Sequence, residues 1–325
     1  MPSEPSNPEG GSGTYLMMVR PACFGFDEET AATNAFQVRG AGGTSEEVAE
    51  RARGEFDGLV ARLRGAAVPV IVFDDTPDPV KPGAVFPNNW VSFHEDGTVV
   101  LYPMATPGRR AEVNLGWVED LGRESGFRIE RLIDWRAEAE HGRFLEGTGS
   151  LVLDRSQRLA YAAISPRTDL ALARQFAQTL NFELIPFRAV DRDGTAIYHT
   201  NVLLSVGPTV AFVCFDAIPD RSERAQLRER LDDGVRIVVD LTWEQLCGFA
   251  GNVLEVRRAT GLPVLVMSSC AHSVISDAVL ESLASRVEIV TSPIPCIERL
   301  GGGSARCMVA AIHLPRTADP GATPT

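Results

Sequence analysis

The chain has 325 residues, 44% of them hydrophobic, which is enough for one large or two ordinary domains with a substantial core. Its formal net charge of −12, with no cluster of Lys and Arg, argues against nucleic acid and anionic membranes as partners. No apolar run approaches the ~18 residues that a membrane helix needs, and no signal peptide is recognisable, so we expect a cytoplasmic protein with reduced thiols.

Five segments of the chain have the apolar spacing of helices. They are residues 46–65, 110–126, 167–182, 221–233 and 273–286. Each is followed by a short strand rich in Val and Ile, at 68–73, 128–133, 183–187, 235–241 and 287–290. A polar loop and one or two further apolar strands come next. The order helix, strand, loop, strand, strand therefore recurs five times, about every 50–60 residues.

The repeats predict one domain of the α/β class. It covers residues 14–314, because the ends at 1–13 and 315–325 are polar and rich in Pro, Ser, Gly or Thr and are predicted to be disordered tails. Aligning the units on the strand after each loop places a small polar residue at the same point. These residues are Asn89, Ser150, Asn201, Asn252 and Cys307. If the loops meet at a common axis, these side chains converge there.

One of these loops is typical of an exposed nucleophile. Gly301, Gly302 and Gly303 let the backbone turn sharply and approach a ligand, and Cys307 follows just before the apolar run 308–312. A cysteine attacks as the thiolate and needs a nearby base or positive charge. The six cysteines show no CxxC or Cys/His spacing of a metal site, so we expect no metal.

The loops of two other units carry an imidazole and a carboxylate. In the aligned frame, His199 and Glu146 precede their strands at almost the position of Cys307. A histidine can act as general acid and base and can hold a cysteine as thiolate. Taken singly, His199 also fits a strand-end core residue and Glu146 a solvent-exposed turn. The alternative dyad is Cys270 with His272, at the entry to the last predicted helix.

Several separated motifs resemble one superfamily. They are FPNNW at 86–90, LEGTG at 145–149, YHTN at 198–201 and GGSARC at 302–307. This set resembles the guanidino-group modifying superfamily, the pentein fold of arginine deiminases, dimethylarginine hydrolases and amidinotransferases. The opening MVRPACFGF at 18–26 and TAATNAFQ at 30–37 look most like the branch of citrulline utilisation hydrolases, or arginine deiminase-related proteins.

The resemblance implies a five-bladed α/β propeller with the site on its axis and no cofactor. It implies that Cys307 is the nucleophile, that His199 is the acid and base, and that Glu146 lies near the substrate's nitrogen atoms. The partner is a small ureido or guanidino amino acid. The sequence is also compatible with a homo-oligomer.

Two asparagines bear on the substrate. Guanidine-hydrolysing branches commonly have aspartates where this chain has Asn89 and Asn201. A guanidinium is a cation with only donors, whereas a ureido group is neutral and has donors and an acceptor, as an amide does. We therefore expect citrulline, converted to ornithine, ammonia and carbon dioxide, rather than arginine.

Further substrate contacts are expected from four other residues. Asn88 belongs to the FPNNW motif, and Arg20 is a candidate partner for the substrate carboxylate, or else a surface arginine. Asn34 and Gln37 either contact the substrate or cap the following segment. Three alternatives remain open at this point: hydrolysis of arginine or a methylated arginine, amidino transfer to an amine, and a non-catalytic propeller like that of a ribosome anti-association factor.

Overall fold

The computed structural model describes residues 13–40 and 42–316, and its strands form five three-stranded sheets. In each sheet the middle strand pairs antiparallel with one neighbour and parallel with the other. Four sheets are β3 (Val91–Phe93), β4 (Thr98–Leu101), β5 (Arg131–Asp134); β6 (Val152–Asp154), β7 (Leu159–Ala163), β8 (Glu183–Phe187); β9 (Leu204–Val206), β10 (Val210–Val213), β11 (Ile237–Asp240); and β12 (Leu254–Arg257), β13 (Pro263–Ser268), β14 (Glu288–Ser292). The predicted fivefold repeat of an α/β chain is confirmed.

The fifth sheet joins the two ends of the described chain. Its middle strand β1 (Tyr15–Arg20) lies between β15 (Ala310–Ile312) and β2 (Val70–Asp74). Successive side chains of β1 point to opposite faces, and both faces are buried. Leu16 and Met18 pack in one core cluster, and Met17 and Val19 pack in another. The continuous apolar run of β1 follows from this double burial.

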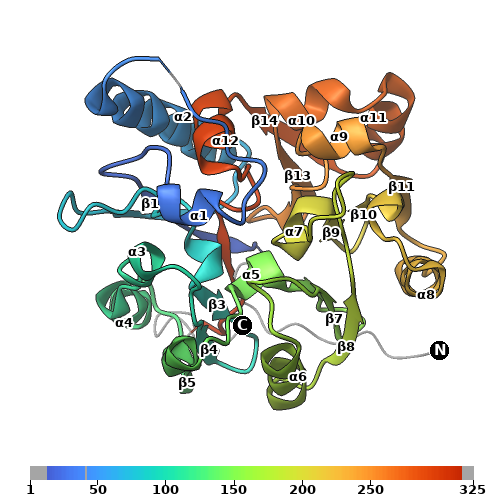
Figure 1. Ribbon diagram of the computed structural model, residues 1–325, viewed down its shortest axis with the longest axis horizontal. Coiled ribbons are helices and arrows are strands. Elements are labelled where there is room, and N and C mark those ends of the chain that lie inside the picture. Colours follow the sequence, from blue (N-terminus) through green and yellow to red (C-terminus); the bar gives the residue numbers. More distant parts are fainter. Residues whose placement is uncertain (1–12, 41, 317–325) are drawn as a thin grey trace, which may run out of the picture.

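A parallel pair of strands needs a crossover, and helices provide it on the outside of the molecule (Figure 1). These are α2 (Ser45–Gly65), α4 (Leu115–Arg123), α6 (Leu170–Thr179), α8 (Arg221–Leu231), and the pair α10 (Ser269–Val274) and α11 (Asp277–Ala284). The strand after each crossover helix belongs to the same sheet as the strand before that helix. The repeat predicted from the sequence had instead grouped each helix and its following strand with strands that come later in the chain.

Short helical turns precede the strands nearest the centre. They include η1 (Pro87–Asn89), α5 (Gly147–Ser150) and α7 (Thr200–Leu203), and α5 packs against the other two. In Figure 1 the sheets follow one another in sequence order around this centre, where α5 and α7 lie. The remaining short elements are α1 (Glu28–Ala31), α3 (Pro107–Arg110), η2 (Arg136–His141), η3 (Phe215–Ala217), α9 (Trp243–Cys247) and α12 (Pro295–Gly301).

Capping residues explain where the predicted helix limits were wrong. The helix expected from residue 110 begins at Leu115, because the Asn114 side chain accepts the N–H of Trp117. The helix expected from 167 begins at Leu170, after the N-cap Asp169. The segment expected at 273–286 is two helices, with the turn between them at residues 275–276.

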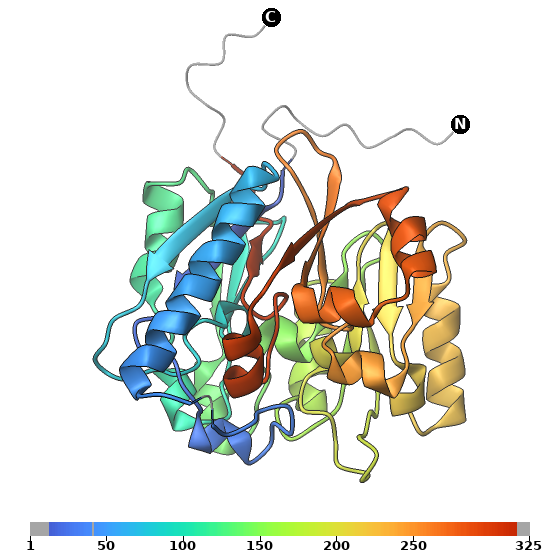
Figure 2. The same cartoon turned by 90° about the horizontal axis from the view of Figure 1, so that it is seen from above.

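The segment between β1 and α2 crosses one edge of the molecule. In Figure 2 its dark-blue trace lies beside the red helix α12, and the N–H of Val38 donates to the carbonyl of Arg299. Of the predicted tails, only Gly13, Pro315 and Arg316 are described, and Arg316 forms a β-bridge with Phe127. Within residues 13–40 and 42–316, no helix is long and apolar enough to span a bilayer.

A buried ion pair between neighbouring sheets gives a stability prediction. The guanidinium of Arg236, just before β11, lies 2.6 Å from Asp154 of β6, and both side chains are almost fully buried. Arg236→Leu leaves that carboxylate buried without a cation, so we expect a loss of roughly 3–5 kcal/mol in the free energy of unfolding by urea. The control Arg123→Leu removes the exposed pair with Asp120 and should cost less than about 1 kcal/mol. Equal small losses would contradict the prediction.

Candidate active site

The turn before Cys307 is packed too tightly for side chains. Gly302 ends α12 with φ of 62°, in the left-handed region, and a Cβ there would lie 2.6 Å from Nδ2 of Asn34. The chain then turns back, so that Cys307 is buried with its sulfur against two asparagine amides. Nδ2 of Asn252 donates to Sγ at 3.2 Å and Nδ2 of Asn201 at 3.4 Å. Burial raises the pKa of the Cys307 thiol, and these two amides oppose that rise.

His199 and Glu146 form a buried hydrogen-bonded pair. Nε2 of His199 lies 2.7 Å from Oε2 of Glu146, and both side chains are almost fully buried. Burial by itself would raise the pKa of Glu146, but Arg167 and the bond with His199 hold that pKa well below its usual range. Burial lowers the pKa of His199 to about 4 despite the carboxylate. Neutral His199 therefore donates from Nε2 to Glu146 and keeps the lone pair of Nδ1 as a base.

The Nδ1 atom of His199 lies beside the side chain of Asn89. A Cβ added to Gly149 would be 2.7 Å from Nδ1 and 2.4 Å from Nδ2 of Asn89, so the two nitrogens flank one small space. His199 also packs against Tyr198, with ring centroids 4.4 Å apart and the rings tilted by 39°. The Tyr198 hydroxyl donates to the carbonyl of Gly302 at 2.7 Å. This contact joins the Tyr198–His199 pair to the turn before Cys307.

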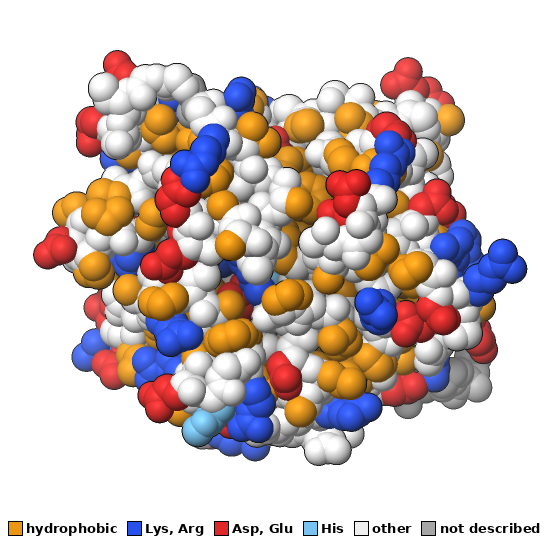
Figure 3. Space-filling view, viewed as in Figure 1, with side chains coloured by type: hydrophobic (Ala, Val, Ile, Leu, Met, Phe, Trp, Pro, Cys, Tyr) orange, Lys and Arg blue, Asp and Glu red, His pale blue; other side chains and the backbone are white. Residues whose placement is uncertain are grey.

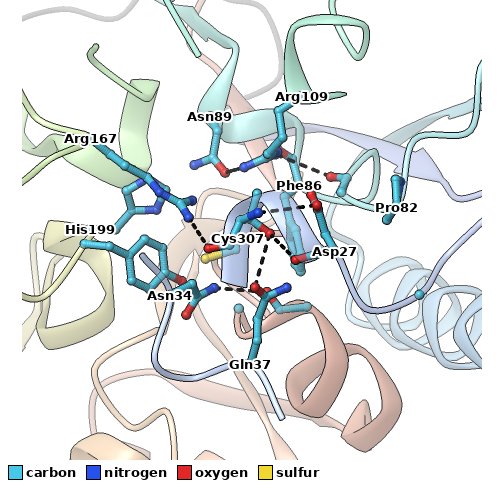
Figure 4. Close-up of a pocket in the computed structure, with 16 residues that line it drawn as sticks. Asp27, Asn34, Gln37, Pro82, Phe86, Asn89, Arg109, Arg167, His199 and Cys307 are labelled. Atoms are coloured by element: carbon cyan, nitrogen blue, oxygen red, sulfur yellow. Dashed lines mark hydrogen bonds between the residues drawn. The ribbon is translucent and has the colours of Figure 1, made fainter. Parts of the chain in front are cut away.

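Of these residues, Asn89, Tyr198, His199 and Cys307 line one pocket, with about 410 Å³ of space including open solvent. It is lined by Gly25, Asp27, Thr30, Asn34, Gln37, Pro82, Gly83, Phe86, Asn89, Arg109, Arg167, Tyr198, His199, Gly301, Gly303 and Cys307. Figure 4 shows Asn89, Arg109, Arg167 and His199 placed around Cys307. The surface around it carries interspersed charges rather than a patch of one sign (Figure 3).

Three predicted contacts lie outside the pocket lining. Arg20 instead makes a bidentate ion pair with Asp57, at 2.8 Å for both bonds. Asn88 is fully buried, and its side-chain amide has no hydrogen-bond partner among the described residues. Asn201 donates to Sγ of Cys307, and its Oδ1 is buried without a partner in the same set. The structure therefore does not bring Arg20 to the site.

Asn34 and Gln37 line the pocket but hold the backbone of the glycine turn. Nδ2 of Asn34 donates to the carbonyls of Gly301 and Gly302, and Nε2 of Gln37 donates to that of Leu300. Oε1 of Gln37 accepts from Thr30. Both side chains thus have protein partners in the glycine turn, rather than in the segment that follows them, where the alternative to substrate contact had placed their role.

Sequence reasoning missed the charged residues of the pocket. Arg109 pairs with the fully buried Glu112 at 2.8 Å and donates to Oδ1 of Asn89 at 2.7 Å. Burial opposes the charge of Arg109, but Glu112 outweighs it and raises the pKa of Arg109. Arg167 bonds the carbonyl of Thr30 and lies 3.5 Å from Glu146. Their positions in the repeat could have indicated them. Arg109 directly precedes the predicted helix of its unit, and Arg167 is the first residue of the predicted helix in the next unit.

Asp27 is the third charged group that the sequence did not reveal. Its Oδ1 accepts the N–H groups of Glu29 and Thr30 and caps α1. Within the described part of the chain it makes no ion pair, unlike the two arginines. Across the same residues no group of three His, Cys, Asp or Glu side chains has a metal-binding arrangement.

Comparison with known families gives a match over most of the chain. Residues 20–314 match the family model described as N,N dimethylarginine dimethylhydrolase, eukaryotic. This segment contains every residue that lines the pocket. A comparison with curated proteins gave no match.

Solved structures share the fold at low identity. The N-terminal domain of ArgZ, an arginine dihydrolase from the ornithine-ammonia cycle in cyanobacteria, has a TM-score of 0.70 and 18% identity over 92% of this chain and 98% of that one. A mutant of AgrE with L-arginine gives 0.71 and 18%, covering 94% of this chain and 41% of its own. A dimethylarginine dimethylaminohydrolase adduct gives 0.62 and 12%, covering 92% and 100%.

The space between His199 and Asn89 yields a second prediction. In Gly149→Ala the new methyl group must displace both side chains, so we expect kcat/KM to fall at least about 100-fold with the fold retained. The control Gly54→Ala lies on the exposed side of α2 with no atom near its Cβ, and should raise stability by about 0.5–1 kcal/mol with unchanged activity. Full activity of Gly149→Ala would show that the space is not used.

Proposed function

Because the chain belongs to the N,N dimethylarginine dimethylhydrolase family, we propose that it hydrolyses a C–N bond of a small ureido amino acid through a covalent intermediate on Cys307. Citrulline is the proposed substrate, and ornithine, ammonia and carbon dioxide are the products. The sheets that follow one another around the site support a five-bladed α/β propeller as the fold. His199 and Glu146 supply the acid-base pair.

In the first step, Sγ of Cys307 bonds to the ureido carbon while the thiol proton passes to Nδ1 of His199. The tetrahedral adduct expels its terminal amino group, which takes that proton from His199 and leaves as ammonia. A thiocarbamate remains on the enzyme, in which the carbonyl carbon is bonded to Sγ and to the nitrogen of the substrate's side chain. Glu146 holds the imidazole through Nε2 and stabilises its transient positive charge.

In the second step, His199 removes a proton from water, whose oxygen bonds to the thiocarbamate carbon. The C–S bond breaks, and Sγ recovers its proton from His199. The product is an N-carboxylated ornithine, which loses carbon dioxide. One water is consumed overall, and the atoms of citrulline and water equal those of the three products.

The orientation of one amide carries the choice of citrulline. Oδ1 of Asn89 accepts from Arg109, which can only donate, so the contact identifies the oxygen and leaves Nδ2 as the free end. That Nδ2 is buried beside His199 and has no partner among the described residues. An unpaired buried donor costs roughly 1–3 kcal/mol, which a ligand with an acceptor removes. A ureido oxygen is such an acceptor, whereas a guanidinium has none.

The charge behind Asn89 supports the same choice. The Arg109 cation, 2.7 Å from the amide oxygen, opposes a second cation on the other side of this amide. A site whose unpaired group is a donor discriminates against a ligand that carries donors alone.

For the amino-acid end, we propose Asp27 as the partner of the α-ammonium group and Arg167 as that of the carboxylate. Both line the pocket, and Arg20 does not. Arginine is the second candidate substrate, since a similar structure, AgrE, was solved with L-arginine and ArgZ is an arginine dihydrolase.

A substrate panel tests the proposed function. Purified protein should release ammonia from citrulline faster than from arginine, methylated arginines or shorter ureido acids, and Cys307→Ala should release none. Ornithine is measured in parallel by its side-chain amino group, which citrulline lacks. Faster release of ammonia from arginine would make arginine the substrate instead of citrulline. No release of ammonia from any of these compounds would contradict the proposed hydrolase activity.

The role of Asn89 gives a sharper prediction. Asn89→Asp keeps an acceptor for Arg109 but replaces the free donor by a carboxylate oxygen. We expect the ratio of kcat/KM for citrulline to that for arginine to fall at least about tenfold. The matched variant Asn114→Asp changes the same side chain at the N-cap of α4 and should leave the ratio unchanged. A constant ratio in Asn89→Asp would mean that this amide does not select the substrate.

A further inference from the structure

The side chain of Asn252 contacts Cys307 at two points, the sulfur and the backbone N–H. Sequence reasoning had given Asn252 no role at the nucleophile. It lies just before β12 and is fully buried. Its Nδ2 donates to Sγ of Cys307 at 3.2 Å and to the carbonyl of Asn201 at 2.8 Å. Its Oδ1 accepts the backbone N–H groups of Ser304 at 3.2 Å and Cys307 at 3.3 Å. One side chain therefore contacts the sulfur, its backbone and a neighbouring loop.

These contacts also determine the orientation of the amide. Backbone N–H groups can only donate, so the end that faces Ser304 and the N–H of Cys307 must be the oxygen. The nitrogen consequently faces the sulfur and the Asn201 carbonyl. With the amide reversed, the two backbone N–H groups would face the NH2 group of Asn252. The carbonyl of Asn201 would face its amide oxygen, so neither side could form a hydrogen bond.

The arrangement favours the charged form of the thiol. Two amide N–H donors, from Asn252 and Asn201, point at Sγ, and a thiolate accepts both. Asn201 makes the longer of these two contacts, and its own oxygen has no partner among the described residues. Its backbone is in turn bonded to Asn252. Asn252 thus holds the sulfur directly and also holds the group that supplies the second donor.

We propose that Asn252 is the positioning residue of the nucleophile: it directs Sγ of Cys307 toward the pocket and stabilises it as thiolate. The proposal rests on the proposed role of Cys307. It requires no substrate contact with Asn252, which does not line the pocket. Its effect is therefore on the thiol and on kcat, rather than on substrate affinity.

The test measures alkylation of Cys307 by iodoacetamide as a function of pH, with peptide mapping by mass spectrometry. In Asn252→Asp a carboxylate oxygen replaces the donor at the sulfur while the acceptor for the backbone remains. We expect the pH midpoint of alkylation to rise by about one unit or more. The rate at a fixed pH below the midpoint then falls about tenfold, and kcat for citrulline should fall while KM changes less than about twofold.

Two further variants separate positioning from stability. Asn252→Ala removes the donor without adding charge and should shift the midpoint in the same direction. The control Asn114→Ala removes the N-cap of α4 and should lower the urea midpoint of unfolding without moving the pH midpoint of alkylation. Exposed Cys247 and Cys270 in the same samples report any general change in reagent reactivity.

A wild-type midpoint in folded Asn252→Ala and Asn252→Asp would overturn the proposal. Loss of folding in both variants, with Asn114→Ala folded, would also overturn it, since Asn252 would then serve the fold rather than the sulfur. The alkylation assay uses no substrate. A shifted midpoint in a protein that hydrolyses nothing would therefore support the positioning role and refute the proposed function separately.

Discussion

The site depends on keeping one carboxylate ionised where no water reaches it. Glu146 is fully buried, and a buried charge is costly unless it is paired and hydrogen-bonded. Here Oε2 meets His199 at 2.7 Å and Arg167 at 3.5 Å, and Oε1 accepts the N–H of Ala105 at 2.9 Å. Each of these partners comes from a different loop, so satisfying Glu146 holds together loops that are distant in sequence.

The ion pair between Glu146 and Arg167 also connects His199 with the segment between β1 and α2. Arg167 also bonds the Thr30 carbonyl and the Thr33 hydroxyl, which belong to the segment between β1 and α2. That segment carries Asp27 and contacts the glycine turn through Asn34. A chain of polar contacts thus runs from His199, through Glu146 and Arg167, to the turn before Cys307. We expect disruption at one end to be felt at the other.

Much of the architecture was predictable because it follows local rules. Strand β8 was predicted with its observed limits, 183–187, since short runs of apolar residues between turn signals depend little on context. Helix limits failed where a cap decided them, as at Asn114 and Asp169. The position of Arg167 was wrong for the same reason: it precedes the cap of α6 and stays outside the helix, where its side chain is free to enter the pocket.

The sequence by itself determined the repeat, the class of fold and the small polar residues that precede the strand after each loop, because all of these follow from local spacing along the chain. Only the tertiary structure decided which of them meet. It brought Asn252 to the sulfur of Cys307, and it placed Arg109 behind Asn89. It also turned Arg20 away toward Asp57. Partners across five sheets are chosen by packing and charge compensation, and neither depends on distance in sequence.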